Sequence, residues 1–144
     1  MGILEAGVQN IRLSWKVAFG TMQEKEWTNM ESQVELKAAN ERNAGTFKRL
    51  MPEIAEPYTA LNQEVYKDGV VSGKNKRLMA LVGALVEGCR ACILYQTEEA
   101  LKQGASVDEI LETCSVALAL GGTMGMGEIT RVMAYLRERD LLPG

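Results

Sequence analysis

The sequence predicts an all-helical protein, and three observations support this prediction. Only three prolines interrupt the 144 residues, and β-branched residues are seldom clustered as they are in strands. Apolar side chains recur every three or four residues along most of the chain, which is the spacing that gives a helix one buried face. Glycine or proline separates these segments, as expected where one helix ends and the next begins.

Residues 1–44 are expected to form a helical extension that serves as an oligomer arm. Apolar residues recur at helical spacing over residues 3–19, and a second helix is predicted over residues 23–43. A solvated pair of amphipathic helices also fits this pattern. Trp15 and Trp27, carried on thin apolar stripes, favour the arm, because exposed aromatic side chains are typical of interfaces.

The next segment holds several signals for helix ends. Gly45 should end the preceding helix, and Thr46 can cap a short helix after it. Pro52 suits the first position of the following helix. Because Pro57 comes so soon afterwards, we expect a short turn and then a helix over residues 56–67.

The middle of the chain is predicted to form two helices joined at a glycine. Asp68-Gly69 signals a turn, and an apolar run predicts a buried helix over residues 75–86. Gly88 can take the positive φ that a helix end often needs. A second helix should follow over residues 93–103.

The last part of the chain is predicted to form two more helices. Ser106 and Glu109 have the spacing of a capping box at the start of a helix over residues 107–120. Residues 121–127 are rich in Gly but lack the Gly-Lys-Ser/Thr ending of a phosphate loop, so we expect them to permit close helix packing. A final helix is expected over residues 128–139.

Composition limits the classes of function. A net charge of −3 gives no basic surface for nucleic acid or an anionic membrane. The longest uncharged run, which ends at Gly127, is too short to span a bilayer. Glu5 interrupts any signal-peptide pattern at the N-terminus. We therefore expect a cytoplasmic protein with no nucleic-acid or membrane partner, whose free thiols stay reduced.

Two of the three cysteines, Cys89 and Cys92, form a Cys-x-x-Cys pair directly after Gly88. We expect this pair in the first turn of a helix, where unpaired backbone N–H groups and the helix dipole favour the thiolate. A thiolate is the reactive form, and a second thiol nearby can trap the product as a disulfide. Cys114 falls at a core position of its helix, so we expect it to be buried and unreactive.

The spacing of the pair alone leaves other interpretations open. A structural zinc site needs four ligands, and the chain has no histidine and only Cys114 beyond the pair, so no metal or cofactor is expected. Haem attachment would require a histidine where Ile93 stands. Two cysteines that act as small buried apolar residues fit the spacing as well as a redox site does.

A series of motifs in the last two thirds of the chain is more specific than the cysteine pair. It comprises Phe47, Leu50, Pro52-Glu53, Tyr58, Leu61, Val65, Asp68-Gly69, Lys74, Lys76, Leu78, Gly88-Cys89 with Cys92, Ala100, Gly104-Ala105-Ser106, Glu109-Ile110, Glu112 and Gly121-Gly122. Together these residues resemble the carboxymuconolactone decarboxylase family, which includes the alkyl hydroperoxidase D branch. The resemblance implies a helical bundle over residues 45–144, with residues 1–44 as an extension outside the match. It also implies a homotrimer or homohexamer.

The sequence departs from the hydroperoxidase pattern at two positions of the proton relay proposed for the family. The usual histidine, four residues after the second cysteine, is Gln96, and a usual glutamate is Arg77. Gln96 can form hydrogen bonds but cannot carry a proton near neutral pH. Arg77, if it points toward the pair, would favour the thiolate by its charge. Glu87 is a candidate replacement for the lost carboxylate. Its position at a helix end favours the simpler interpretation, that it is a solvated surface residue.

The resemblance makes thiol redox chemistry the leading hypothesis: an antioxidant, thiol-dependent peroxidase of peroxiredoxin type, or a disulfide oxidoreductase. Cys92 would attack the peroxide substrate, since it lies one helical turn from Gln96, and Cys89 would resolve the product. An unidentified thiol or disulfide would donate electrons. Activity should be weak because the relay is lost. The alternatives are a lactone decarboxylase like the family's namesake and a non-catalytic oligomeric binding protein.

Overall fold

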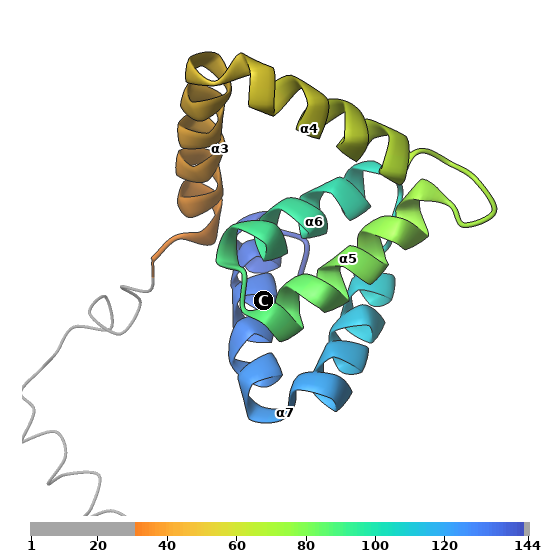
Figure 1. Ribbon diagram of the computed structural model, residues 1–144. Helices are drawn as coiled ribbons and strands as arrows, with labels where there is room; N and C mark the ends of the chain where they lie inside the picture. The colour runs from red at the N-terminus through yellow and green to blue at the C-terminus, as the bar shows by residue number, and fades with distance from the viewer. Residues whose placement is uncertain (1–30, 143–144) are drawn as a thin grey trace, which may run out of the picture. The chain divides into compact units, whose positions relative to one another are not determined.

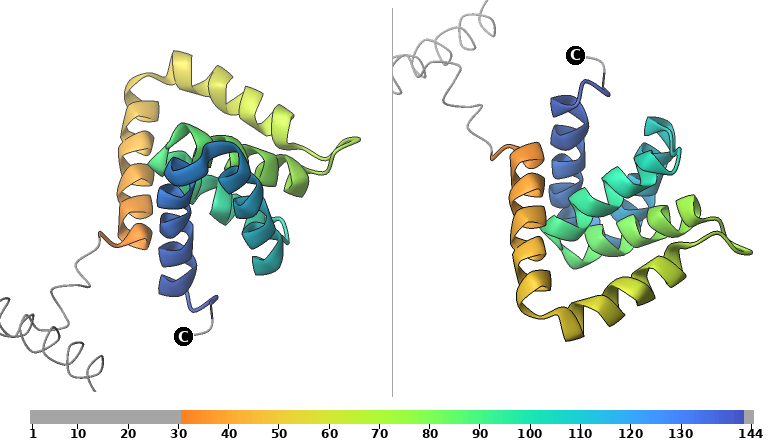
Figure 2. Two further views of the ribbon diagram at one scale, coloured as in Figure 1. Left: turned by 90° about the horizontal axis from the view of Figure 1, so that it is seen from below. Right: turned by 90° about the horizontal axis from the view of Figure 1, so that it is seen from above.

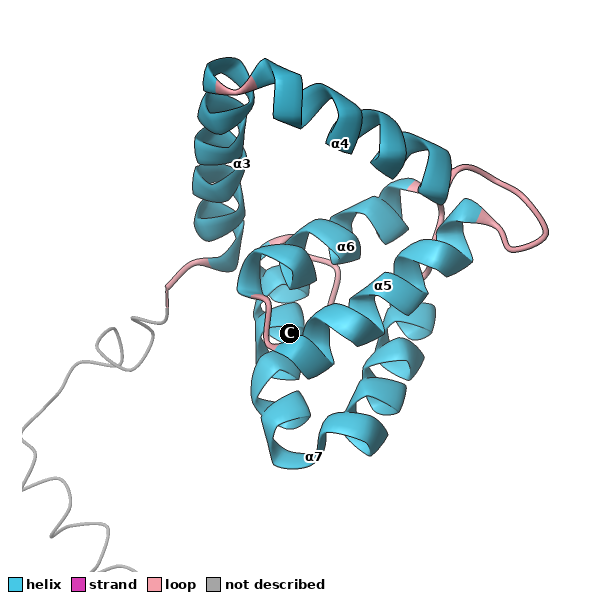
Figure 3. Ribbon diagram, in the orientation of Figure 1, coloured by secondary structure: helices cyan, strands magenta, loops and turns pink. Residues whose placement is uncertain are grey.

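The structure of the protein is a computed structural model, and it describes residues 31–142. Every regular element among these residues is a helix, so the all-helical prediction is confirmed for this part of the chain (Figures 1 and 3). The helices are α3 (Gln33–Leu50), α4 (Pro52–Tyr66), α5 (Gly73–Glu87), α6 (Arg90–Lys102) and α7 (Val107–Glu138). The predicted helix over residues 3–19 and the two tryptophans lie outside the described residues.

The core is formed by α5, α6 and α7, which pack on one another, while α3 and α4 flank them (Figure 2). Burying each large apolar side chain of this core stabilises the fold by about 1.5–3 kcal/mol. The main contributors are Leu81, Leu85, Ile93, Ile110, Cys114, Val132 and Leu136.

Polar contacts hold α3 against this bundle. The buried residues of α3 are Gln33 and Lys37, and Lys37 forms an ion pair with Glu98 of α6. Glu138 of α7 accepts hydrogen bonds from the Ser32 hydroxyl (2.7 Å) and from backbone N–H groups at the start of α3 (3.0 Å). Burial alone would raise the pKa of Glu138, but these donors outweigh it and hold that pKa below its usual value.

The bounds of α3 differ from the prediction at both ends. The helix begins at Gln33 after the cap Ser32, and it runs through Gly45 to Leu50. Thr46 is not a cap, because it lies inside the helix and its hydroxyl donates to the Arg42 carbonyl at 3.1 Å. A glycine costs only about 1 kcal/mol inside a helix, which is too little to end one among good helix formers. The predicted boundary between residues 44 and 45 therefore falls inside α3. The assembly role of residues 1–44 stays a prediction.

The start of α4 is also predicted wrongly. Pro52 opens the helix as expected, but α4 continues through Pro57 without a turn. Pro57 removes one hydrogen bond, to the carbonyl of Glu53, and both residues are exposed, so water can reach that carbonyl. Leu61 and Val65, two apolar residues of this helix, are 60% and 48% exposed.

α7 contains the two helices predicted for the end of the chain, as two arms that meet at a sharp bend. The expected capping box of Ser106 and Glu109 starts it, and its only departure from helical geometry is at Gly122, where φ is 55° and the chain bends back on itself (Figure 1). A Cβ at Gly125 would lie 2.9 Å from the Ala117 carbonyl oxygen, so glycine is needed for the two arms to approach. By length and composition α7 could cross a membrane, but neither arm has the roughly 20 residues needed.

The predicted glycine junction is confirmed. Gly88 ends α5 with φ of 69°, in the left-handed region, and α6 begins at Arg90 and returns alongside α5 (Figure 1). The N–H of Cys89 donates to the Ala84 carbonyl at 3.0 Å, which closes the end of α5. The turn therefore places the cysteine pair at the first turn of α6.

We predict that Gly88→Ala lowers the free energy of unfolding by about 1 kcal/mol, because an L-residue is strained at this positive φ. The matched control is Gly83→Ala in the same helix, where a new Cβ meets no atom within 4 Å. Alanine there should stabilise by about 0.5–1 kcal/mol. Urea unfolding at one protein concentration measures both. Equal effects of the two changes would contradict the role given to Gly88.

Candidate active site

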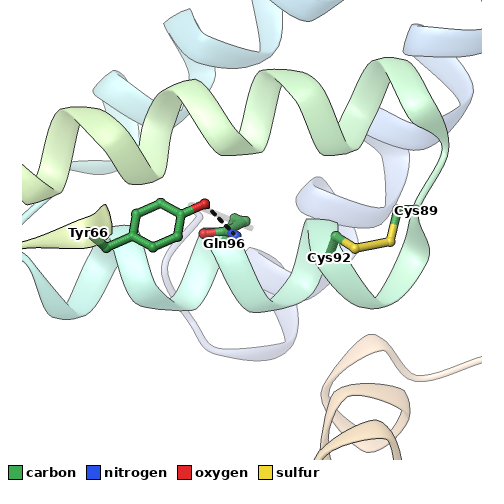
Figure 4. The surroundings of a disulfide bond; sticks show 4 residues. All are labelled: Tyr66, Cys89, Cys92 and Gln96. Carbon is green, nitrogen blue, oxygen red and sulfur yellow. Dashed lines mark hydrogen bonds between the residues drawn. A yellow bond between two sulfur atoms is a disulfide. The ribbon is translucent and has the colours of Figure 1, made fainter. Parts of the chain in front are cut away.

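The cysteine pair lies where α6 begins. Cys89 is the N-cap residue of α6, and Cys92 is in its first turn, as predicted. The two sulfur atoms are joined in a disulfide, with the Cα atoms 5.2 Å apart (Figure 4). Cys92 is exposed and Cys89 is partly buried. A substrate or an external thiol can therefore reach the Cys92 sulfur.

The position of the pair favours a thiolate once the disulfide is reduced. The first backbone N–H groups of a helix lack partners within the helix, and the dipole makes this end positive. Both effects stabilise a negative sulfur. Glu87, the last residue of α5, is exposed, and no hydrogen bond among the described residues joins it to either cysteine. The proton-transfer role considered for Glu87 therefore stays a prediction.

The residues at the two positions that depart from the hydroperoxidase pattern touch one another. Arg77 donates from Nη1 to Gln96 Oε1 at 3.1 Å. The amide nitrogen of Gln96 donates in turn to the Tyr66 hydroxyl at 3.5 Å. Figure 4 shows Gln96 between Tyr66 and the cysteine pair, one turn of α6 from Cys92. The described hydrogen bond of the Arg77 guanidinium thus goes to Gln96 rather than to a sulfur atom.

Arg77 is the buried cation of this site. It is only 6% exposed, and its Cζ lies 3.6 Å from the centroid of the Tyr66 ring and 5.5 Å from that of Tyr95. Such cation–π contacts stabilise a desolvated guanidinium. Its Nη2 is 3.8 Å from Glu99 Oε2, and its Nε is buried with no hydrogen-bond partner. Sequence reasoning missed Tyr66, Tyr95 and Glu99 as members of this cluster.

A weak signal for part of the cluster was present in the sequence. Tyr95 and Gln96 come four and three residues before Glu99, so helical spacing places Glu99 near both side chains. Tyr66 and Arg77 come from other helices, and no local pattern links them to α6.

Cys114 takes no part in the pair. It is 3% exposed within the core, and burial raises the pKa of its thiol to about 11. The prediction of a buried core cysteine is confirmed. Among the described residues, no group of three or more His, Cys, Asp or Glu side chains could hold a metal ion.

A comparison with known families decides the relationship of the chain. The model of the carboxymuconolactone decarboxylase family matches residues 52–137. The chain belongs to the carboxymuconolactone decarboxylase family. That match begins with α4 and ends in the last turn of α7, so the family region contains the cysteine pair and the Arg77 cluster.

Two solved members of the carboxymuconolactone decarboxylase family have similar structures. One, from Legionella pneumophila, has a TM-score of 0.68 at 26% identity, and the match covers 75% of this chain and 97% of that one. The other, from Thermotoga maritima, is a member for which an antioxidative role has been suggested. It has a TM-score of 0.56 at 32% identity, covering 60% of this chain and 89% of that one.

Two further relatives are uncharacterized proteins. One, from Cupriavidus necator, is 24% identical over 94 residues, which cover 65% of this chain and 83% of the relative. The other, encoded in the cox locus of Paracoccus denitrificans, is 28% identical over 96 residues, which cover 67% and 86%.

We predict that Cys89 and Cys92 cycle reversibly between dithiol and disulfide while Cys114 stays unmodified in the native protein. With a pKa of about 11, only about one Cys114 thiol in a thousand is ionised at pH 8. Alkylation of the reduced protein followed by mass spectrometry measures this, and labelling in urea, where all three thiols should react, is the control. Cys114 labelled as fast as Cys92 in the folded protein would contradict the assignment.

Proposed function

We propose that this protein is a thiol-dependent peroxidase or disulfide oxidoreductase that works through Cys89 and Cys92. The observation that carries the proposal is a solvent-accessible disulfide at the first turn of α6 in a carboxymuconolactone decarboxylase family fold. Family membership by itself supports an enzyme-like fold and leaves the reaction open. The suggested antioxidative role of the Thermotoga maritima relative is consistent with the proposal.

The proposed peroxide reaction begins at Cys92, which is the more exposed cysteine. Its thiolate attacks one oxygen of a hydroperoxide, the O–O bond breaks, and the alkoxide leaves as an alcohol after taking a proton. The sulfur becomes a sulfenic acid. The thiol of Cys89 then attacks that sulfur, which forms the disulfide and releases water. An external dithiol returns two electrons by thiol–disulfide exchange.

The proton for the leaving oxygen is the weak point of this reaction. Neither a guanidinium nor an amide is a useful proton donor near neutral pH, so Arg77 and Gln96 do not supply the proton. General acid–base catalysis typically contributes about 10²- to 10⁴-fold. We therefore propose a reactive thiol with slow turnover. Lactone decarboxylation needs a proton shuttle at the same place, so the Arg77–Gln96 pair disfavours that alternative more strongly.

We predict that the double change Arg77→Glu with Gln96→His raises peroxidase kcat by about 10²-fold or more. The two side chains are in direct contact at 3.1 Å, so the new carboxylate can hydrogen-bond to the new imidazole and support its protonated form. Gln96→His alone should gain much less, because the neighbouring Arg77 cation disfavours an imidazolium. Peroxide consumption with reductant in excess measures wild type, the two single variants and the double variant.

The two single variants serve as controls. A working relay requires that the gain in kcat of the double variant be well beyond the combined gains of the two single variants. A wild-type protein that already turns over as fast as the double variant would contradict the account. In that case another group, with Glu87 as the first candidate, carries the proton.

We also propose that the chain assembles as a homo-oligomer, with a trimer or hexamer as the expected forms. One stripe of α4, together with the end of α3, exposes an unusual number of large apolar side chains: Phe47, Leu50, Met51, Ile54, Tyr58, Leu61 and Val65. On α4 this stripe is separate from the buried Ala55 that faces the rest of the chain. Exposed apolar surface of this extent is typical of a protein interface.

We predict that Leu61→Glu shifts the protein toward smaller species, because it places a charge in the middle of the apolar stripe. Gln63→Glu is the matched control: it adds the same charge to an exposed position on the opposite side of α4. Light scattering across micromolar concentrations measures the mass of each. A wild-type monomer over that range, or equal effects of the two changes, would contradict the assignment of this face.

A further inference from the structure

The Arg77 guanidinium has more hydrogen-bond donors than its surroundings satisfy. A guanidinium carries five N–H donors. One reaches Gln96 Oε1 at 3.1 Å, and Nη2 is 3.8 Å from Glu99 Oε2, which is beyond hydrogen-bond distance. The Nε donor is buried and has no partner. Buried polar groups are nearly always paired, and a buried charge without partners is costly, so this arrangement requires an explanation.

The side-chain acceptors near Arg77 are already engaged. The Gln96 carbonyl oxygen is already used by Arg77, and the Gln96 amide nitrogen is itself a donor to the Tyr66 hydroxyl. The rings of Tyr66 and Tyr95 shield the cation but accept no in-plane hydrogen bond. The Glu99 carboxylate is shared with a second cation, because its other oxygen accepts a hydrogen bond from the Lys102 ammonium at 2.9 Å.

We propose that Arg77, Gln96 and Tyr66 form a carboxylate-binding site that selects a substrate carrying an acid group. A carboxylate offers two oxygens that match the edge formed by the Nε and Nη donors of an arginine. The Gln96 amide and the Tyr66 hydroxyl can add donors to the same ligand. Both side chains are only partly buried, so rotation of either opens Arg77 to an entering carboxylate.

The carboxylate-binding site lies close enough to the cysteines to position a substrate for reaction. Gln96 lies one turn of α6 from Cys92, and a helical turn rises about 5.4 Å (Figure 4). A substrate held by its carboxylate at Arg77 can therefore present a reactive group to the Cys92 sulfur a few bonds away. Tyr95, which is 39% exposed, offers an aromatic surface for the hydrocarbon between the two ends. This deepens the proposed function and rests on it for the substrate class, a carboxylate-bearing organic hydroperoxide.

Binding of hexanoate to the full-length protein tests the site without any turnover. Hexanoate should raise Tm in a concentration-dependent way, and sodium chloride of equal ionic strength should not. It should also shift the NMR signal of the Arg77 Nε–H. Gln96→Glu places a carboxylate beside Arg77 within the chain, so this variant should have a higher Tm and no response to hexanoate. Hexanoate that leaves both Tm and the Nε–H signal of wild type unchanged would overturn the proposal.

Two more variants separate the carboxylate site from a structural role of Arg77. Arg77→Met should lose the hexanoate response. Glu99→Gln removes the competing carboxylate, so it should tighten hexanoate binding if the cation is available to ligands. If Glu99→Gln instead lowers Tm and hexanoate affects no variant, Glu99 is the partner of Arg77 and the proposal is overturned. A Tm response to hexanoate that survives Arg77→Met overturns it as well.

Kinetics distinguish failure of the site from failure of the proposed function. The comparison is between a short-chain hydroperoxy carboxylic acid, whose hydroperoxide is a few bonds from its carboxylate, and uncharged tert-butyl hydroperoxide. Gln96→Glu should raise KM for the acid relative to the uncharged peroxide by about 10- to 100-fold, the value of one charge-assisted hydrogen-bonded contact. A ratio unchanged by Gln96→Glu contradicts the substrate class. If neither peroxide is consumed by any variant, the proposed function fails, and the hexanoate titration still decides the site.

Discussion

The reversal of the chain at Gly88 is the constraint on which the candidate site depends. Its left-handed backbone ends α5 and lets α6 return along the same helix. That return places Cys89 and Cys92 at the positive end of α6 and brings Gln96 beside Arg77. The two parts of the site, the sulfur pair and the buried cation, therefore arise from one turn. A change in the turn would disturb both.

The two departures from the hydroperoxidase pattern make sense as a pair. Arg77 and Gln96 are 19 residues apart in sequence but in hydrogen-bond contact, so the side chain chosen at one position limits the other. A glutamate beside Gln96 would leave a buried carboxylate with fewer donors, and a histidine beside Arg77 would meet a like charge. In the function proposed here, the thiol pair keeps its redox role. Arg77 and Gln96 do not transfer protons but bind an anionic group of the substrate.

Local sequence signals predicted the features that depend on neighbouring residues. Gly88, the Ser106–Glu109 capping box and the core position of Cys114 all follow from backbone conformation or helical spacing, and the structure has each of them. Predictions failed where a local cost was small compared with its surroundings, as at Gly45 and Pro57 inside long helices. Contacts between distant segments, such as Lys37 with Glu98 and Tyr66 with Arg77, have no local signal, so the polar attachment of α3 and the tyrosine cover of the cation could not be predicted.

On the proposed function, the Cys89–Cys92 disulfide is a working redox couple rather than a structural crosslink. Its reduction potential is the most direct measurement, made by equilibrating the native protein in glutathione buffers for the less reducing range and in dithiothreitol buffers for the more reducing range. We expect one two-electron transition between about −270 and −120 mV, the range of catalytic thiol–disulfide couples. A potential below about −300 mV, typical of structural disulfides, would contradict the account.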